Sequence, residues 1–340
     1  MTMRVALGRV QVFVEKRTAL LALALCLAAA ALAVYSVASG TINYSLAEVM
    51  SALALRGEDK TELVIWSIRL PRAVAAIAVG MALGAAGSVF QSISRNALGS
   101  PDVIGFTTGA ATGAVLQIVL YNKGATATAL SAVAFGVVTA VIVYLLSRNR
   151  GSTGGYRLVL IGIGVSAMLS ALNTLLLAWG DLDLAVKARI WLSGSLNARE
   201  WNDVYPALIA LAICLPMLIY YSRPLNILEM GDDQAKQLGV NTERLRLIVM
   251  ILGVLLTSVA VAAAGPIAFI ALAAPQIVSR ITGAARVQVI CSGLFGAVLL
   301  LAADMISRNL PTSYAVPVGL TTGVIGGFYL LWILTRQKAV

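Results

Sequence analysis

The sequence of 340 residues contains no histidine. This absence removes the imidazole that activates serine or cysteine nucleophiles, and it removes zincin motifs, histidine-ligated haem and histidine proton relays. Ser193 and Gly194 resemble part of an intramembrane serine protease motif, but no general base of the usual type accompanies them. A GxxxxGK[ST] loop for nucleotide phosphates is also missing. We therefore expect no enzyme, no catalytic residue, no metal site and no cofactor bound by this chain.

Charge and cysteine are scarce. Charged residues make up 12% of the chain and hydrophobic residues 59%, and the mean hydropathy is +0.90. The three cysteines, Cys26, Cys214 and Cys291, each lie within an apolar stretch, where they are expected to pack as small hydrophobic residues without a disulfide framework. This composition is typical of a helical membrane protein and excludes an ordinary soluble domain.

Long apolar stretches recur along the chain, and a transmembrane helix needs about 20 such residues. The sequence predicts an all-α, polytopic membrane protein with about ten transmembrane helices in one domain over residues 1–340. Six helices are expected within 18–222 and four within 247–335, and the first is too long for a signal peptide. The predicted stretches are 18–39, 72–91, 101–120, 125–147, 157–179, 204–222, 247–265, 266–280, 286–305 and 315–335.

The connections between these stretches differ in charge. Basic residues gather in alternate connections, whereas most acidic residues fall in the others. The positive-inside rule then places both termini and the polar insert 226–246 in the cytoplasm. The net charge of +10 belongs to this face, which favours anionic lipid headgroups over nucleic acid. We expect a multi-pass protein of the bacterial cytoplasmic membrane.

The insert 226–246 is the most polar segment between two apolar stretches. Its first part favours a short helix with Leu228, Ala235 and Leu238 near one face and Gly239 as the stop, followed by a second short helical turn at 242–245. Two small helices that project from a membrane bundle would form a docking surface for a soluble partner. The alternative is an ordinary solvated loop between helices.

Glycine and proline mark a second pattern. Gly84 and Gly87 lie within one predicted helix, and Gly105 and Gly109 lie within the next. Their spacing lets helices approach closely in lipid. Ordinary bundle packing is the alternative to a role along a pathway, and it explains most of these glycines. Pro266, Pro275 and Pro317 interrupt apolar stretches instead; broken helices of this kind are typical of transporters.

Charged groups inside the predicted helices are few. Asp102 and Asp304 lie near helix ends, and Asn173 is the one polar side chain deep in a stretch. A proton- or ion-coupled secondary transporter needs a carboxylate or cation within the membrane, and none is obvious. An energy source outside this chain is therefore favoured. The secondary transporter and a structural membrane protein remain as alternatives.

Four blocks in matching order resemble the FecCD-type permeases of ABC importers, which move ferric siderophores, haem and vitamin B12. The blocks lie at 69–110, beginning RLPR and containing RNALGSPDVIGFTTGA, at 228–240 (LEMGDDQAKQLGV), at 265–283 (GPIAFIALAAPQIVSRITG) and at 304–334 (DMISR, then PVGLTTGVIGGFYLLWIL). Ala97 and Gln276 depart from the family pattern, which has proline and histidine there. The sequence APQ is common in permeases of the ferric-enterobactin type, so the resemblance favours a catecholate siderophore over haem or vitamin B12.

The resemblance implies a permease subunit that pairs with a second permease copy or paralogue; homodimer and heterodimer both remain open. Two ATPase subunits carrying ATP-Mg would dock on the insert, and an extracytoplasmic binding protein would dock on the other face. Two five-helix halves are related weakly, through 84–113 and 253–283. The residues assigned to ATPase coupling are Leu228, Gly231, Ala235, Leu238, Gly239 and Val240; to binding-protein docking, Arg69, Arg72 and Arg308; and to the translocation pathway, Gly84, Gly87, Gln91, Asn96, Gly105 and Gly109.

Overall fold

The computed structural model describes residues 2–7, 10–40, 42–149, 152–153, 155–284, 286–310 and 316–336. Residue 1, residues 337–340 and residue 315 of the last predicted stretch lie outside these residues. The cytoplasmic placement of both termini stays a prediction. Within the described part, a helix occupies each of the ten predicted stretches. They are α1 (Lys16–Ala38), α4 (Leu70–Ser94), α5 (Phe106–Leu116), α6 (Ala125–Ser147), α7 (Gly155–Trp179), α9 (Trp201–Glu229), α11 (Thr242–Ala264), α12 (Ile270–Thr282), α13 (Val289–Asn309) and α14 (Val318–Arg336).

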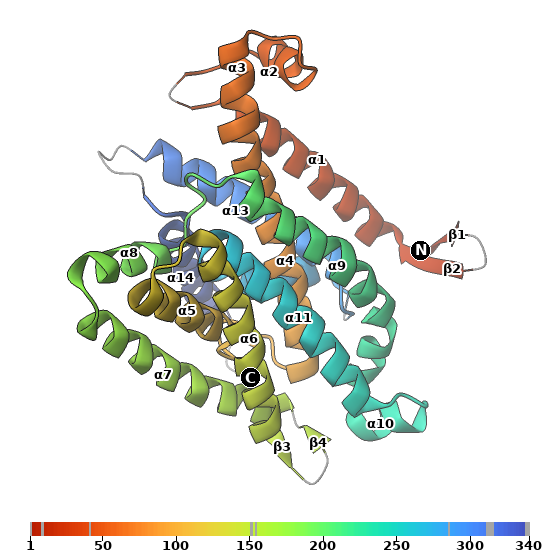
Figure 1. Ribbon diagram of the computed structural model, residues 1–340. Helices are drawn as coiled ribbons and strands as arrows, with labels where there is room; N and C mark the ends of the chain where they lie inside the picture. Colours follow the sequence, from red (N-terminus) through yellow and green to blue (C-terminus); the bar gives the residue numbers. More distant parts are fainter. Residues whose placement is uncertain are drawn as a thin grey trace.

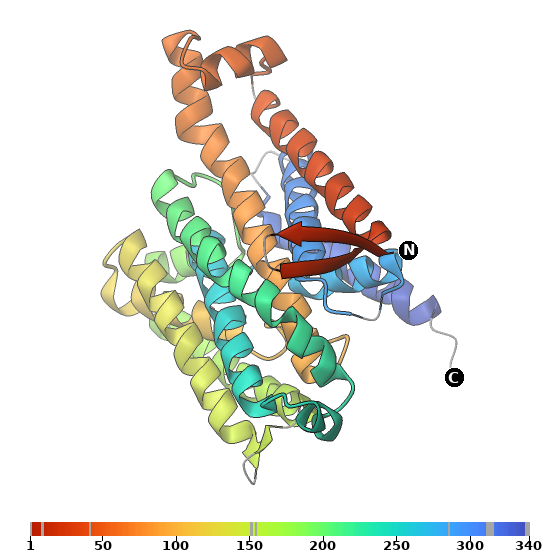
Figure 2. The same cartoon turned by 90° about the vertical axis from the view of Figure 1, so that its right-hand side faces the viewer.

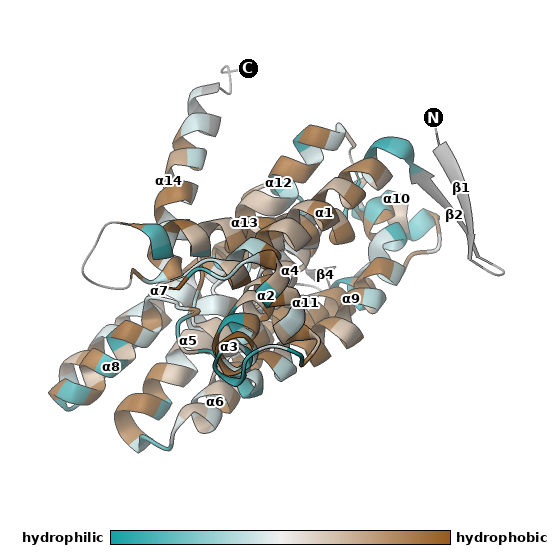
Figure 3. Ribbon diagram, turned by 90° about the horizontal axis from the view of Figure 1, so that it is seen from above, coloured by the Kyte–Doolittle hydropathy of each residue, from teal (hydrophilic) through white to brown (hydrophobic). Residues whose placement is uncertain are grey.

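Seven helices of the described chain are long and apolar enough to cross a membrane. Three more are apolar but shorter, namely Phe106–Tyr121, Ile270–Thr282 and Val318–Trp332. The prediction of an all-α polytopic bundle is confirmed. Hydrophobic residues make up much of the helices (Figure 3). Many large apolar side chains, most of them leucine and isoleucine, are exposed on the outside of the bundle.

Several short elements were not predicted. Helices α2 (Leu46–Leu53) and α3 (Asp59–Val64) lead through the π-helical turn η1 (Ile65–Arg69) into α4, and η2 (Gln117–Tyr121) extends α5. Helix α8 (Leu182–Leu192) follows α7, and α10 (Asp232–Gln237) follows α9. Two small antiparallel hairpins, β1 (Thr2–Leu7) with β2 (Val10–Glu15) and β3 (Arg148–Asn149) with β4 (Ser152–Thr153), lie outside the bundle.

Helix α4 forms the centre of the bundle. It packs against α13, α11, α9 and α12, and most of its side chains are buried (Figures 1 and 2). Close approach of the backbones requires glycine: a β-carbon at Gly84 would overlap the carbonyl oxygen of Ser292 on α13, and one at Gly87 would overlap that of Ala271 on α12. Small residues let helices pack closely in lipid, where the hydrophobic effect does not drive association. Ordinary bundle packing is therefore confirmed for these two glycines.

The bundle has two distinct ends. Helices α2 and α3 project from one end, whereas α10 lies at the opposite end (Figures 1 and 2). Helix α2 begins with a capping box, in which the Ser45 hydroxyl accepts a hydrogen bond from the backbone N–H of Glu48 at 3.3 Å and the Glu48 carboxylate accepts one from the Ser45 N–H at 2.7 Å. These hydrogen bonds from Ser45 hold the pKa of Glu48 below its ordinary value.

Candidate functional site

The predicted insert folds as one short helix, α10, between two long ones. Helix α9 runs on to Glu229, beyond its predicted end, and Gly231 then turns the chain with a positive φ of 123°. Gly239 follows α10 with a φ of 81°, which confirms it as the stop. The predicted second short helix is wrong, because residues 242–245 form the first turn of α11. Asn241 caps that turn by accepting a hydrogen bond from the Arg244 N–H at 3.1 Å.

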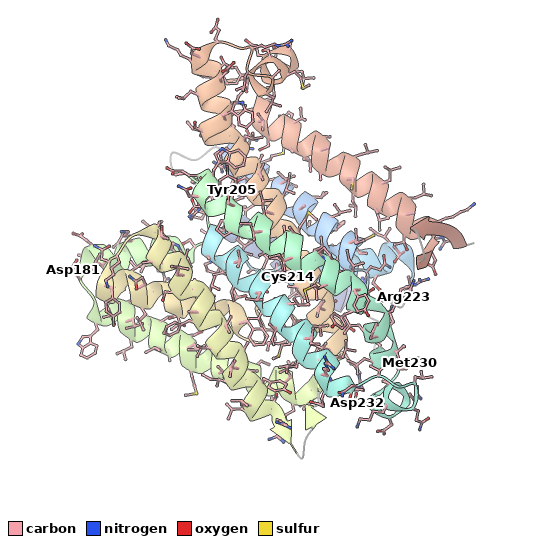
Figure 4. The ribbon with its side chains drawn as sticks, turned by 45° about the vertical axis from the view of Figure 1, so that its right-hand side comes forward. Asp181, Tyr205, Cys214, Arg223, Met230 and Asp232 are labelled. Atoms are coloured by element: carbon pink, nitrogen blue, oxygen red, sulfur yellow. The ribbon has the colours of Figure 1, made fainter. Side chains whose placement is uncertain are left out.

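The residues assigned to ATPase coupling divide between two faces. Leu228 and Ala235 are both 0% exposed, so they anchor α10 to the chain's own core and cannot lie on its outer surface. Leu238 is 63% exposed, and Gly231 and Gly239 have open space where a side chain would be. Val240 packs against the core while partly buried. Met230, which sequence reasoning missed, is 62% exposed at the same end (Figure 4).

A cluster of charged side chains ties α10 to two long helices. The Asp232 carboxylate accepts hydrogen bonds from Arg246 of α11, at 2.6 Å from Nη2 and 2.9 Å from Nη1. It also pairs with Arg95, the residue that ends α4 in a left-handed conformation with a φ of 49°. Arg246 is only 4% exposed and contacts Glu243 at 3.2 Å as well. Asp232 therefore holds the short helix, the end of α4 and the start of α11 together.

A polar cavity of about 370 Å³ lies beside this cluster. Gln91 and Asn96, both assigned to the translocation pathway, line it, and Gln91 donates a hydrogen bond to the Leu272 carbonyl at 3.0 Å. One buried polar atom in the lining, Gln288 Oε1, has no hydrogen-bond partner among the described residues, whereas the Ser92 hydroxyl lies beside the Glu229 carboxylate. The lining residues are Ser88, Gln91, Ser92, Arg95, Asn96, Ala97, Glu229, Pro275, Ser279, Arg286, Val287, Gln288 and Ser292.

The glycines assigned to the pathway are contacts within this chain. Gly84 and Gly87 lie against α13 and α12, as described above. Gly105 approaches Ser166 of α7, with 3.0 Å between its would-be β-carbon and the Ser166 β-carbon, and a β-carbon at Gly109 would overlap Thr139 of α6. Neighbours within the chain fill the space beside Gly84, Gly87 and Gly109, so packing accounts for each of these glycines. That the helices carrying them approach an interface between subunits stays a prediction.

The arginines assigned to binding-protein docking are engaged inside the chain. Arg72 forms a bidentate pair with Asp304, at 2.8 Å from Nη2 to Oδ1, and the Asp304 side chain is 1% exposed. Arg308 contacts the same carboxylate at 3.2 Å and donates to Ser36 Oγ at 2.7 Å. Arg69 donates to the Val37 carbonyl at 2.8 Å. The expectation that the three are fully exposed is wrong, because each is only partly exposed and fastens the end of α1 to α4 and α13. Their docking to a binding protein stays a prediction.

Both carboxylates considered for ion coupling have protein partners. Asp304 has two arginines, and Asp102 accepts a hydrogen bond from Thr107 Oγ1 at 2.6 Å and another from the Phe269 backbone. A coupling residue must be able to exchange a proton or ion during the cycle, and Asp304 is held by two fixed cations. This arrangement argues against the interpretation of the chain as an ion-coupled secondary transporter.

Comparisons with known proteins agree with this geometry. The model of the FecCD transport family matches residues 25–336. The chain is 42% identical over 327 residues to the ferric enterobactin transport system permease protein FepG of Escherichia coli (strain K12), covering 96% of this chain and 99% of that protein. It is 33% identical over 308 residues to the iron(3+)-hydroxamate import system permease protein FhuG of Bacillus subtilis (strain 168), covering 88% and 91%. A metal-chelate type ABC transporter solved in an inward-facing conformation matches with a TM-score of 0.84 at 29% identity, covering 94% of this chain and 100% of that one.

Proposed function

The chain belongs to the FecCD transport family and is a membrane permease subunit of an ABC importer, and we propose that it carries a ferric siderophore, with a catecholate chelate as the preferred cargo. Catalysis is not its role, because members of this family are transport subunits of the cytoplasmic membrane. The single observation that carries the cargo proposal is the 42% identity to a ferric enterobactin permease over nearly the full length of both chains.

Gln276 supports the same cargo class. It stands in the sequence APQ, which the resemblance links to the ferric-enterobactin type of permease. A relative named for hydroxamate import is also similar, at 33% identity, so the chelate class is the finer part of the proposal. Haem and vitamin B12 are the alternative cargoes.

The proposed assembly has three further components. A second permease subunit covers part of the apolar surface, two ATPase subunits bind ATP-Mg, and an extracytoplasmic binding protein delivers the chelate. The ATPase contact is proposed to lie on the outer side of α10, where Met230 before the helix and Leu238 after it are exposed beside a charged surface. A short helix with exposed apolar anchors suits a helix-in-groove contact.

Cargo competition tests the proposal. The permease is expressed with its ATPase and binding protein in a host that lacks its own siderophore permeases, and uptake of radioactive ferric tris-catecholate is measured. We expect an excess of unlabelled ferric tris-catecholate to compete, and equal excesses of ferric trihydroxamate, haem and vitamin B12 to compete at least about tenfold less well, a difference of about 1.4 kcal/mol. Preferential competition by any of the other three would overturn the catecholate assignment.

A further inference from the structure

Three interruptions of the helical chain meet at the end of the bundle opposite α10. They lie at 193–200, after α8, at 265–269, after α11, and at 316–317, before α14. The Ser195 N–H donates to the Ala264 carbonyl at 2.7 Å, and the Gly319 N–H donates to the Gly194 carbonyl at 3.1 Å. A β-carbon at Gly194 would overlap the Pro266 carbonyl oxygen. These hydrogen bonds join three unwound segments into one platform. In transporters, irregular backbone at membrane depth is tolerated where it lines a cavity.

A cavity of about 470 Å³ lies on this platform. Its walls come from η2, the start of α6, α8, the 193–200 segment, the start of α9, the end of α11 and the residue before α14, all within one chain. The lining residues are Ile118, Asn122, Gly124, Ala125, Thr128, Lys187, Ile190, Trp191, Ser195, Asn197, Arg199, Asp203, Ala262 and Pro317.

The charged groups of the lining favour an anion. Two cationic side chains, Lys187 and Arg199, line the cavity together with one carboxylate, Asp203. One oxygen of that carboxylate already accepts a hydrogen bond from the Glu200 N–H at 3.2 Å and so caps α9. Arg199 is anchored through Nε to the Ser195 carbonyl at 3.1 Å, which uses one of its five donors. Lys187 reaches Asn122 Oδ1 at 3.2 Å across the cavity mouth. Guanidinium and ammonium groups on fixed supports recognise oxygen anions well.

We propose that this cavity is an anion-binding subsite that accepts one catecholate arm of the incoming chelate, with Lys187 and Arg199 facing its oxygens and the Trp191 indole against its ring. The proposal rests on the proposed function. A volume of about 470 Å³ suits a single aromatic arm and part of its linker, not a whole tris-catecholate complex.

A charge-selective labelling experiment tests the subsite without requiring transport. Cys26, Cys214 and Cys291 are replaced by alanine, and Asn197→Cys is introduced as the reporter in membrane vesicles that hold the full complex. We expect an anionic sulfonate thiol reagent to react about fivefold faster than a cationic trimethylammonium reagent of the same size, because fixed cations concentrate anions locally. Lys187→Gln with Arg199→Gln is expected to remove this preference, whereas Arg189→Gln, an exposed cation of α8 outside the lining, keeps it.

The ligand class is tested on the same reporter. Ferric tris-catecholate is expected to slow labelling of Asn197→Cys at least about threefold, and the neutral ferric trihydroxamate to leave the rate unchanged. Equal labelling by both reagents, an unchanged preference in the double variant, or equal protection by the two chelates would each overturn the subsite. A separate measurement distinguishes failure of the proposed function. If that function is wrong, the parent complex shows charge-selective labelling but no ATP-driven uptake of ferric catecholate.

Discussion

The Gln276 side chain donates a hydrogen bond from Nε2 to the carbonyl oxygen of Ala97, at 2.6 Å. These residues are 179 positions apart in the chain, and they are the two positions at which the sequence departs from its family's pattern. The bond ties α12 to the segment that follows α4, beside the polar cavity. Gln91 makes a parallel bond from α4 to α12, through the Leu272 carbonyl at 3.0 Å. The two residues that depart from the family pattern, Ala97 and Gln276, are therefore partners in one hydrogen bond.

Substitution of Gln276 tests this contact. Gln276→Ala leaves the Ala97 carbonyl without its donor and is expected to lower stability in detergent by about 0.5–1 kcal/mol, since the contact is partly exposed. Gln276→His keeps a donor near the carbonyl and should cost less. Thermal melting of the purified complex measures both. Equal losses in the two variants would show that the hydrogen bond does not matter.

Leu238 provides a test of the ATPase contact. Leu238→Arg places a charge at an exposed apolar position of α10 and is expected to reduce co-purification of the ATPase about tenfold or more, without loss of permease yield. Leu228→Ala is the contrasting variant: it opens a cavity in the core and is expected to lower stability by about 2–4 kcal/mol. Normal ATPase recovery with Leu238→Arg would exclude this face of α10 as the contact.

Asp232 is expected to couple α10 to the long helices. Asp232→Asn removes the charge that pairs with Arg95 and with the buried Arg246, so stability should fall by about 1–3 kcal/mol. ATP hydrolysis should continue while less chelate is transported per ATP, because α10 no longer moves together with the end of α4. The ratio of uptake to hydrolysis in proteoliposomes measures this.

Asp233→Asn is the matched control, since Asp233 is exposed and adjacent on the same helix. The same ratio in Asp232→Asn and in the parent complex would contradict the coupling role of Asp232.

The Asp304 cluster is predicted to be structural. Asp304→Asn leaves Arg72 and Arg308 facing a neutral group in a buried site, and breaking such a pair costs about 3–5 kcal/mol. Arg56→Gln, at an exposed position, should change stability by less than about 0.5 kcal/mol. Yield and melting temperature after membrane extraction distinguish the two. A stable Asp304→Asn variant that loses only the capture of the binding protein would contradict the structural role and favour the predicted docking role of Arg72 and Arg308.

The capping box of α2 predicts a local pH dependence. Hydrogen bonds from Ser45 lower the pKa of Glu48 in the folded protein, so the carboxylate stabilises α2 above its unfolded pKa, and this contribution is lost as pH falls through the lowered folded pKa. Hydrogen exchange of the α2 amides, corrected for intrinsic rates, should therefore show weaker protection in acid. Glu48→Gln should lose this dependence, and a parent-like pH profile in that variant would contradict it.

Much of the fold follows from the sequence, because each membrane-crossing helix needs a long apolar run and the runs are separated by polar connections. Helices α6 and α7 match their predicted stretches closely for that reason. Helix α8 was missed because it is short and carries charges, so its hydropathy resembles that of a loop. Helix α9 exceeds its prediction because the helix continues through more polar residues beyond the apolar run, as far as Glu229.

The site was harder to predict. Gly239 could be recognised because a helix stop needs a residue that adopts positive φ. The Asp232 cluster could not be, since its three members come from positions 95, 232 and 246 and only the packing of α4 against α11 brings them together. Arg72 and Arg308 appeared exposed because each lies near the end of an apolar run. Their shared partner, Asp304, lies 232 residues after Arg72.

Reconstitution tests the central claim most directly. The permease, its ATPase and its binding protein are placed in proteoliposomes, and the uptake of radioactive ferric tris-catecholate is measured with and without ATP, in the presence and absence of a proton gradient. The account predicts uptake that requires ATP and the binding protein, continues without the gradient, and stops when the P-loop lysine of the ATPase is replaced. Uptake driven by the gradient without ATP would contradict it.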